Sequence, residues 1–265
     1  MAMYLAFFGT AFQASLAYRG RVWASVFGNL IGVFAWVSIW IALYGVAGGS
    51  QSGVTLQEMI TYAIFSSLLL EGWSWNEFVQ LVGRQIKTGD VSVFLLKPLR
   101  YPLMLLAGEC GKLAFRVVAV ILPVALIVGL IYGVAPPASP FHAGMAGVLL
   151  LLGFAILFLL ATIAGLLGFW VMTVFSLEWT LQALLLILAG WTVPLWFFPA
   201  PAAAIIEKLP FAYTAYHPMA VYLGKFDVEK TLCTLAIGVG WAVLLAVFAA
   251  WLWSRARRRI VVQGG

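Results

Sequence analysis

Long stretches of apolar residues alternate with short polar stretches along the whole chain. A transmembrane helix needs about 20 consecutive apolar residues, and six stretches reach or approach that length. We therefore predict an all-α integral membrane protein with six membrane-spanning helices. The expected spans cover residues 22–46, 56–83, 109–132, one stretch within 143–177, 179–198 and 231–253.

The stretch before the first span, residues 1–20, is apolar and aromatic but also contains Gln13, Ser15 and Arg19. This mixture predicts a helix that lies in the membrane interface. The alternative is that these residues are a frayed start of the first span.

Prolines mark the connections between the spans. Residues 133–141 contain three prolines and are expected to form a turn. The longest connection, residues 199–230, contains four prolines and many aromatic residues. We predict that it is an external region, partly inserted in the membrane, with a short helix at 202–209. Pro194 lies inside the fifth apolar stretch and predicts a kink or a broken helix there.

The positive charges predict the orientation of the chain, because the cytoplasmic side of a membrane protein carries the excess of lysine and arginine. Six spans with both termini in the cytoplasm place twelve of the 15 cations on that side and only Lys208, Lys225 and Lys230 outside. The reverse orientation would place the twelve outside. The net charge of +6 is therefore explained by topology and does not indicate nucleic acid binding.

The composition restricts the chemistry that the chain can perform. Hydrophobic residues make up 64% and charged residues 9% of the chain, whereas about 25% of a soluble domain is charged. The motifs GxxxxGK[ST], HExxH, CxxC and GxSxG do not occur. Because Cys110 and Cys233 lie in or beside separate apolar stretches, and His142 and His217 are both expected outside, we expect no disulfide, no metal and no cofactor in this chain.

The middle of the second expected span is unusually polar, since residues 71–77 read EGWSWNE. A carboxylate such as Glu71 near the centre of a bilayer is costly and suggests a functional site. One interpretation is that it lines a substrate path with Trp73, Trp75 and Asn76, in which the indole rings contact a flat or cationic solute. The alternative is a structural carboxyl group that is bonded to a neighbouring helix.

Three charged residues, Glu109, Lys112 and Arg116, begin the third span at spacings of three and four. This spacing favours a ladder of charges within one helix. The alternative is a surface that binds a partner.

Residues 84–98 form a polar insertion in an otherwise apolar half of the chain. We predict a cytoplasmic loop with a short helix, which Thr88 or Asp90 caps at its start and which ends before Pro98. An apolar face on a cytoplasmic loop needs another surface to cover it. The residues of that face are Val91, Val93, Phe94 and Leu95.

Six spans, a basic loop after the second span and a proline-broken region before the sixth resemble the ABC-2-type permeases. The sequences GDVSVFLLKP at 89–98 and LPFAYTAYHP at 209–218 are similar to those of a subgroup of small bacterial six-span permeases. The resemblance covers nearly the whole chain and implies one transmembrane domain over residues 1–265.

The resemblance also implies partners. In this family two permease subunits pair, and each receives a separate cytoplasmic P-loop ATPase that binds ATP and Mg²⁺. The helix at 87–96 would fit a groove of that ATPase, and the chain would be the permease subunit of an exporter in the bacterial plasma (inner) membrane, without an ATPase site of its own. The residues implied in coupling are Lys87, Gly89, Asp90, Val91, Phe94, Leu95 and Lys97.

Pairing of two permease chains is expected through the first span. Gly28 and Gly32 form a pair of small residues that allows close contact between helices, and the fifth span would complete the interface.

Two other functions are considered. A secondary transporter would show inverted repeats and buried charges for ion coupling, and neither is evident in the sequence. A lipid-modifying membrane enzyme would need a convergent polar cluster, and only the residues around 71–77 approach one.

Overall fold

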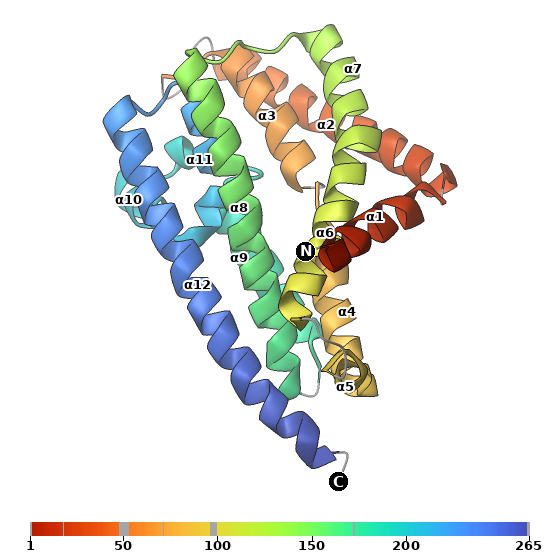
Figure 1. Cartoon of the computed structure of the whole chain (residues 1–265). Coiled ribbons are helices and arrows are strands. Elements are labelled where there is room, and N and C mark those ends of the chain that lie inside the picture. The colour runs from red at the N-terminus through yellow and green to blue at the C-terminus, as the bar shows by residue number, and fades with distance from the viewer. Residues whose placement is uncertain are drawn as a thin grey trace.

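The computed structural model describes residues 2–17, 19–47, 53–70, 72–95, 100–171 and 173–263 (Figure 1). Within these ranges the chain is helical and forms no β-strand. The α-helices are α1 (Ala2–Leu16), α2 (Arg19–Ala47), α3 (Leu56–Leu70), α4 (Trp75–Thr88), α5 (Asp90–Leu95), α6 (Tyr101–Arg116), α7 (Leu122–Tyr132), α8 (Pro140–Leu166), α9 (Phe175–Leu188), α10 (Ala200–Ile206), α11 (Tyr216–Tyr222) and α12 (Val228–Gln263).

Short helical segments of other types connect several of these helices. A π-helical turn, η1 (Val117–Ile121), joins α6 to α7. Three 3₁₀ turns, η2 (Leu167–Phe169), η3 (Leu195–Phe197) and η4 (Pro210–Thr214), lie in the second half of the chain.

Among the described residues, four helical stretches are long and apolar enough to cross a membrane by length and composition. They correspond to the first, third, fourth and sixth expected spans. The all-helical fold is therefore confirmed, with four helices that are candidates for membrane spans, whereas the second and fifth expected spans are not continuous helices. The four stretches are Gly20–Val46, Tyr101–Tyr132, Pro140–Phe169 and Val228–Arg258.

The span expected at residues 56–83 is divided in two, which corrects the prediction of one helix. α3 ends at Leu70 and α4 begins at Trp75, so the break falls in the polar sequence EGWSWNE. A Cβ atom at Gly72 would lie 3.0 Å from the carbonyl oxygen of Leu68, so the chain passes close to its own backbone at the break. α4 is amphipathic, because Phe78, Val79 and Val82 are buried while its other side carries exposed polar residues.

The fifth expected span is also interrupted. α9 ends at Leu188, and Gly190 has a φ angle of +76°, which favours glycine. Short helical segments follow from 195 to 222, and Pro194 precedes the first of them. A broken helix in this stretch is confirmed, but the break begins after Leu188, before Pro194 is reached. The short helix expected at 202–209 lies at 200–206.

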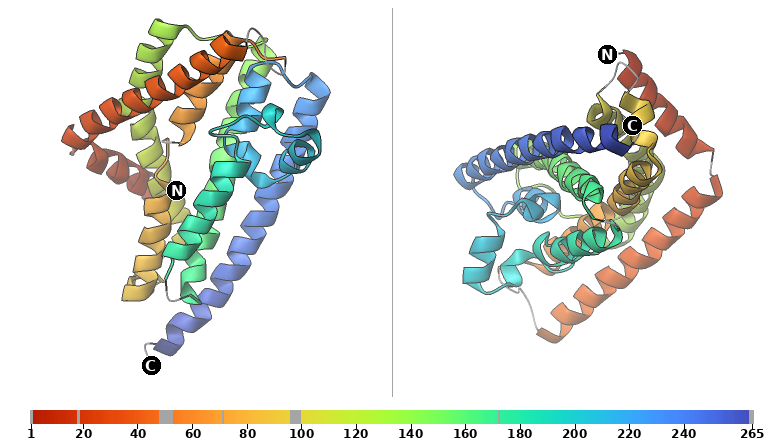
Figure 2. Two further views of the ribbon diagram at one scale, coloured as in Figure 1. Left: turned by 180° about the vertical axis from the view of Figure 1, so that it is seen from behind. Right: turned by 90° about the horizontal axis from the view of Figure 1, so that it is seen from below.

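α8 lies at the centre of the bundle and packs against α4, α9, α11 and α12. Glycines allow these close contacts, because a Cβ at Gly153 would overlap the carbonyl oxygen of Tyr213, and one at Gly165 would lie 2.8 Å from the Cβ of Val82. In Figure 1, α5 and the carboxyl end of α12 lie at one end of the bundle, and α10 and α11 lie toward the other. Figure 2 shows the same separation from behind.

α1 packs along α6 rather than continuing α2 (Figures 1 and 2). Gly111 of α6 makes this contact possible, since a Cβ there would overlap the carbonyl oxygen of Phe8. The sequence-based expectation of a separate amino-terminal helix is met in the fold, and its position in a membrane interface stays a prediction.

The polar insertion at 84–98 differs from the expected loop. Lys87 belongs to the last turn of α4, so it is not part of the short helix that was expected at 87–96. Gly89 has a φ angle of +76° and ends α4, and the short helix α5 starts at Asp90. Thr88 Oγ1 donates a hydrogen bond to Asp90 Oδ2 at 2.6 Å across this corner.

Candidate functional site

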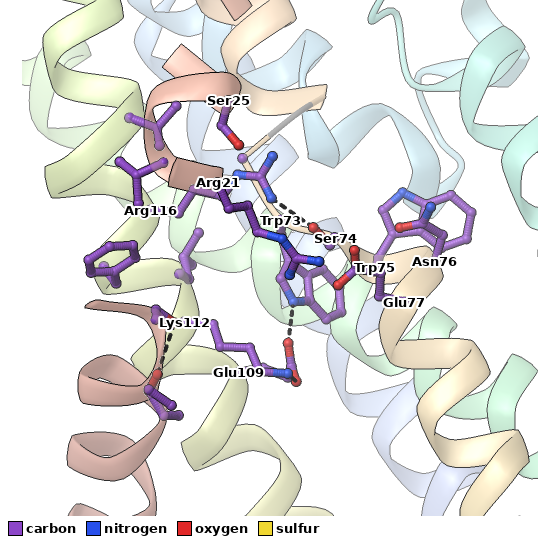
Figure 3. Close-up of a pocket in the computed structure, with 18 of the residues that line it drawn as sticks. Arg21, Ser25, Trp73, Ser74, Trp75, Asn76, Glu77, Glu109, Lys112 and Arg116 are labelled. Atoms are coloured by element: carbon purple, nitrogen blue, oxygen red, sulfur yellow. Dashed lines mark hydrogen bonds and ion pairs between the residues drawn. The ribbon is translucent and has the colours of Figure 1, made fainter. Parts of the chain in front are cut away.

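A cavity of about 760 Å³ lies where the divided second span meets α1, α2 and α6 (Figure 3). Its walls come from the second half of α1, the start of α2, the break before α4 and the last two turns of α6. The lining residues are Ala11, Ala14, Ser15, Arg21, Val22, Ser25, Leu70, Gly72, Trp73, Ser74, Trp75, Asn76, Glu77, Glu109, Lys112, Leu113, Phe115, Arg116, Val120 and Gln182.

A buried carboxylate holds one wall of the cavity in place. The side chain of Glu109 is only 5% exposed. It accepts a hydrogen bond from Trp73 Nε1 at 2.8 Å and one from Lys112 Nζ at 2.7 Å. A buried carboxylate is costly unless such partners compensate the loss of water. Glu109 therefore links α6 to the break between α3 and α4.

Arg116 makes a second link between the same two elements. Its Nη1 donates a hydrogen bond to Ser74 Oγ at 2.7 Å, and Ser74 is the residue that precedes α4. The helix changes to the π-helical turn η1 directly after Arg116. Pro123 explains this change, because proline lacks the N–H that an α-helix requires and its ring displaces the carbonyl group four residues earlier.

The charges among the described lining residues are mixed. Three cations, Arg21, Lys112 and Arg116, and two carboxylates, Glu77 and Glu109, are among its lining residues. Lys112 and Glu109 neutralise each other at 2.7 Å. Figure 3 shows the side chains of Arg21 and Arg116 extending toward the segment that carries Ser74 and Glu77. The cavity can therefore hold a polar or charged group better than an apolar one.

A second hollow of about 470 Å³ adjoins the first, because Ser25, Leu70 and Arg116 line both. It runs along the α2 face that carries Gly28 and Gly32, and a Cβ added at either glycine would meet no atom within 4 Å. The further lining residues are Asn29, Val33, Trp36, Ser67, Trp191 and Thr192. The two hollows together give a series of small and polar residues along one side of α2.

The structure brings three of the four residues of the expected substrate path to the charged cavity. Trp73, Trp75 and Asn76 line it, whereas Glu71 lies outside the described residues. The two indole rings are only 6% and 3% exposed. Trp73 packs edge-on against Phe154 with 5.3 Å between ring centroids. The rings therefore serve mainly as packing, and the expectation that they offer open faces to a solute is not supported.

Sequence reasoning placed Arg116 in a ladder along one helix and did not connect Arg21 with the site. The ion pair between Glu109 and Lys112 confirms part of that ladder. Arg116 instead reaches Ser74, which lies 42 positions away in the sequence. The one signal in the sequence for this contact was the polar sequence around Ser74. Polar side chains within an expected span need hydrogen-bond partners from another helix.

The residues expected to couple to an ATPase are divided between surface and interior. Lys87, Gly89 and Asp90 are exposed at the corner between α4 and α5. Val91 is only 1% exposed and belongs to the chain's own core, which corrects its assignment to a partner-facing surface. The ring of Phe94 is partly buried beside Tyr101, with 5.8 Å between centroids.

Two more of the coupling residues lie outside what the structure describes. These are Lys97 and the side chain of Leu95. Among the expected coupling residues that the structure describes, Lys87, Gly89 and Asp90 are therefore the exposed ones.

Comparison with known proteins adds one finding. A family model with the description "ABC-2 family transporter protein" matches residues 30–264. The match begins inside α2 and includes every element after it. Neither the curated proteins nor the solved structures compared with the chain show a significant match.

Proposed function

The chain belongs to the ABC-2 family of transporter proteins, and from this premise we propose that it is the permease subunit of an ATP-driven exporter in the bacterial plasma (inner) membrane. The observation that carries the proposal is the charged cavity with its adjoining hollow, set among the membrane-crossing helices of a chain from a transporter family. Polar and charged side chains among membrane-crossing helices are costly, and they typically mark a substrate path or a binding site.

The proposed orientation places both termini and the corner between α4 and α5 in the cytoplasm. Two features support it. α5 and the carboxyl end of α12 lie at the same end of the bundle (Figure 1), and twelve of the 15 cations fall on that side. The polypeptide would cross the membrane six times, with α3 and α4 together forming the second crossing and α9 with the turns after it the fifth.

The proposed partner is a cytoplasmic P-loop ATPase that binds ATP and Mg²⁺. No described residue of this chain offers a nucleotide-binding motif, so hydrolysis would take place on the partner. The exposed corner formed by Lys87, Gly89 and Asp90, with Phe94 at its edge, is the surface that we assign to this contact.

A second copy of the chain, or a similar one, would complete the transporter. The face of α2 that carries Gly28 and Gly32 is open in the single chain, and small residues at such a spacing let two helices approach closely. Pairing there would place the adjoining hollows of two chains beside each other and form a shared path. Gly28→Leu should therefore weaken the dimer, and an unchanged dimer in detergent and in bilayers would remove α2 from the interface.

The test of the ATPase contact is Phe94→Ala in the complex with the proposed P-loop ATPase. Truncating an aromatic hot-spot residue of an interface typically costs about 2 kcal/mol or more, so the ATPase should be released or its hydrolysis uncoupled from transport. Lys87→Ala removes an exposed charge and should have a much smaller effect, mainly on association rate.

The measurements are pull-down of the ATPase and ATP hydrolysis of the reconstituted complex. Because Phe94 also packs beside Tyr101, the thermal stability of the membrane chain is measured with each variant. Unchanged binding and unchanged hydrolysis in Phe94→Ala would remove this corner from the coupling contact.

A further inference from the structure

We propose that Tyr101 is the residue through which the corner between α4 and α5 acts on α12, the helix that reaches the opposite end of the bundle. The inference rests on the proposed function for what moves the corner, namely the ATPase, and it names the residue that passes this movement on. Three observations support it: the contacts of Tyr101, the continuity of α12 and the contacts of α12 at its other end.

Tyr101 is the first residue of α6, and its side chain contacts three other helices. The ring of Phe94 in α5 lies 5.8 Å away between centroids. The ring of Trp253 in α12 stacks on Tyr101, with 4.9 Å between centroids and 17° between the ring planes. The Tyr101 hydroxyl donates a hydrogen bond to Gln85 Oε1 of α4 at 2.6 Å. Both helices of the corner are therefore connected to α12 through one side chain.

The surroundings of Tyr101 are packed closely enough to pass on a displacement. Tyr101 is only 2% exposed, and Val91 of α5 and Leu252 of α12, which belong to the same core cluster, are 1% and 4% exposed. Close-packed protein interiors transmit strain, and aromatic pairs favour particular orientations at centroid distances of about 4.5 to 7 Å. We therefore expect the three rings of Phe94, Tyr101 and Trp253 to move together.

α12 carries such a movement across the bundle because it is one uninterrupted helix. Its 36 residues, at a rise of 1.5 Å per residue, give a length of about 54 Å. α4, in contrast, begins only after the break in the second expected span. The carboxyl end of α12 lies at the same end of the bundle as α5 (Figures 1 and 2), so a shift there acts on the end of a long rigid element.

The other half of α12 contacts η4, which lies between α10 and α11 in the chain. Tyr213 of η4 donates a hydrogen bond to the carbonyl oxygen of Thr234 at 2.8 Å. The two elements approach closely, because a Cβ at Gly238 would overlap the Tyr213 ring. A shift of α12 therefore changes contacts at the end of the bundle opposite the corner. In this proposal Tyr101 is a positioning residue, which acts through the helices that it connects.

The first experiment uses the full-length chain alone in detergent. It measures hydrogen exchange of the backbone amides at residues 250–258, where Trp253 holds α12 against Tyr101. Tyr101→Leu and Trp253→Leu remove the stacked pair, and each should raise the exchange rate there about three- to tenfold, as expected for the loss of an aromatic pair. Phe94→Ala, in a different helix, should raise the rate about twofold in the parent and have no further effect in the Tyr101→Leu background.

Two control variants separate the ring contacts from general disturbance of the corner. Tyr101→Phe keeps both ring contacts and loses the hydrogen bond to Gln85, so Phe94→Ala should affect α12 in this background as it does in the parent. Ser92→Ala removes an exposed hydroxyl of α5 that donates to the Gly89 carbonyl at 2.6 Å. It breaks a hydrogen bond of the corner and none of the ring contacts, and it should leave exchange at 250–258 unchanged.

Several outcomes would overturn the inference. These are an unchanged exchange rate at 250–258 in Phe94→Ala, an effect of Phe94→Ala that persists when Tyr101 is leucine, and an effect of Ser92→Ala as large as that of Phe94→Ala. Because Tyr101 is buried, Trp253→Leu, at a partly buried position, is the second background. It interrupts the same path and should likewise abolish the effect of Phe94→Ala, which keeps the test decisive if Tyr101→Leu does not fold.

The second experiment follows the movement to the opposite end in the complex with the proposed ATPase. A non-hydrolysable ATP analogue with Mg²⁺ should change hydrogen exchange at η4 in the parent and in Tyr101→Phe. Trp253→Leu should lose most of that change while pull-down of the ATPase stays intact.

The outcomes of the second experiment distinguish this inference from the proposed function. A full response at η4 in Trp253→Leu would show that the movement takes another route, and loss of ATPase binding in that variant would show that the ring contacts shape the ATPase surface instead. Both results would overturn the role of Tyr101. A parent chain that binds no ATPase would remove the proposed function, whereas the effect of Phe94→Ala on α12 is measured without an ATPase and is judged separately.

Discussion

The α10–α11 end of the bundle and the charged cavity use their charges differently. At the end with α10 and α11, ion pairs join separate elements: Lys225 lies 2.7 Å from Glu58 of α3, and Lys230 lies 3.1 Å from Glu207. At the charged cavity, the ion pair between Lys112 and Glu109 stays within α6. Arg116 of the same helix donates to Ser74 Oγ at 2.7 Å, beside a hollow of about 760 Å³.

This difference indicates which end of the bundle is closed. Ion pairs between elements, buried aromatic rings and glycine contacts hold the α10–α11 end together, so substrate could pass there only after those contacts separate. The region of the cavity is already hollow. In the proposed orientation, the closed end would face the outside of the cell. The following predictions test that contrast.

The largest effect is expected where α8 meets η4 at the closed end. In Gly153→Ala the new methyl group would overlap the carbonyl oxygen of Tyr213, which is backbone and cannot rotate away. We expect the free energy of unfolding to fall by about 3 kcal/mol, at the upper end of overpacking effects. Thermal unfolding of the purified chain in detergent measures this change.

Gly147→Ala, on the same helix, is the matched control. A Cβ there meets nothing within 4 Å, and alanine is the better helix former by about 0.5 to 1 kcal/mol. This variant should be as stable as the parent or slightly more so. Equal stability of the two variants would show that the α8 contact at this end is loose.

The second prediction concerns His217, which is buried at the closed end, outside the membrane-crossing helices. Burial lowers the pKa of His217 to about 4, and the nearby positive charge of Lys230 acts in the same direction, whereas the hydrogen bond to the Glu207 carbonyl and the Glu207 charge oppose this shift. In the unfolded chain the pKa returns to about 6.5. Between pH 6.5 and 4 the unfolded state therefore binds a proton that the folded state does not.

The free energy of unfolding should consequently fall as the pH decreases through this window, by roughly 2 to 3 kcal/mol in total. His217→Gln keeps a donor for the Glu207 carbonyl, which lies 2.9 Å from Nε2, but it does not titrate. The difference in melting temperature between the parent and this variant should change with pH over the window. If the melting temperatures of the parent and of His217→Gln change in parallel with pH, this histidine is accessible to protons in the folded chain.

The sequence predicted the helices of these two regions better than the contacts between the helices. Four long apolar helices follow from composition, because lipid-facing and buried positions are both apolar. The break after Leu70 was signalled by the polar sequence EGWSWNE, but a polar cluster on the inner face of a continuous helix produces the same pattern. Only the contacts of Trp73 with Glu109 and of Ser74 with Arg116 show why the chain is interrupted there.

The exposed corner shows the same limit. An apolar pattern at Val91 and Phe94 indicates that something covers these side chains, but it does not tell whether the cover is a partner or the chain itself. The structure buries Val91 in the chain's own core. Contacts between residues that are far apart in sequence decide such cases, and periodicity carries no information about them.

The smallest effect is expected at the ion pair of the cavity end, and its two halves should differ. The side chain of Glu109 is 5% exposed and that of Lys112 is 50% exposed. Lys112→Gln leaves a buried carboxylate with Trp73 as its remaining partner among the contacts described above, and we expect a loss of about 1 to 2 kcal/mol in stability. Glu109→Gln leaves a solvated lysine and an amide oxygen that can still accept from Trp73 Nε1, so the loss should stay near 0.5 kcal/mol.

The double variant should therefore be more stable than Lys112→Gln alone, because it removes the uncompensated carboxylate. Thermal unfolding of the parent, the two single variants and the double variant forms a double-mutant cycle. This cycle yields the coupling energy between Lys112 and Glu109. Equal losses in the two single variants would mean that water reaches Glu109 and compensates it. In that case the cavity extends behind Trp73, and the contrast with the closed end is larger than the structure indicates.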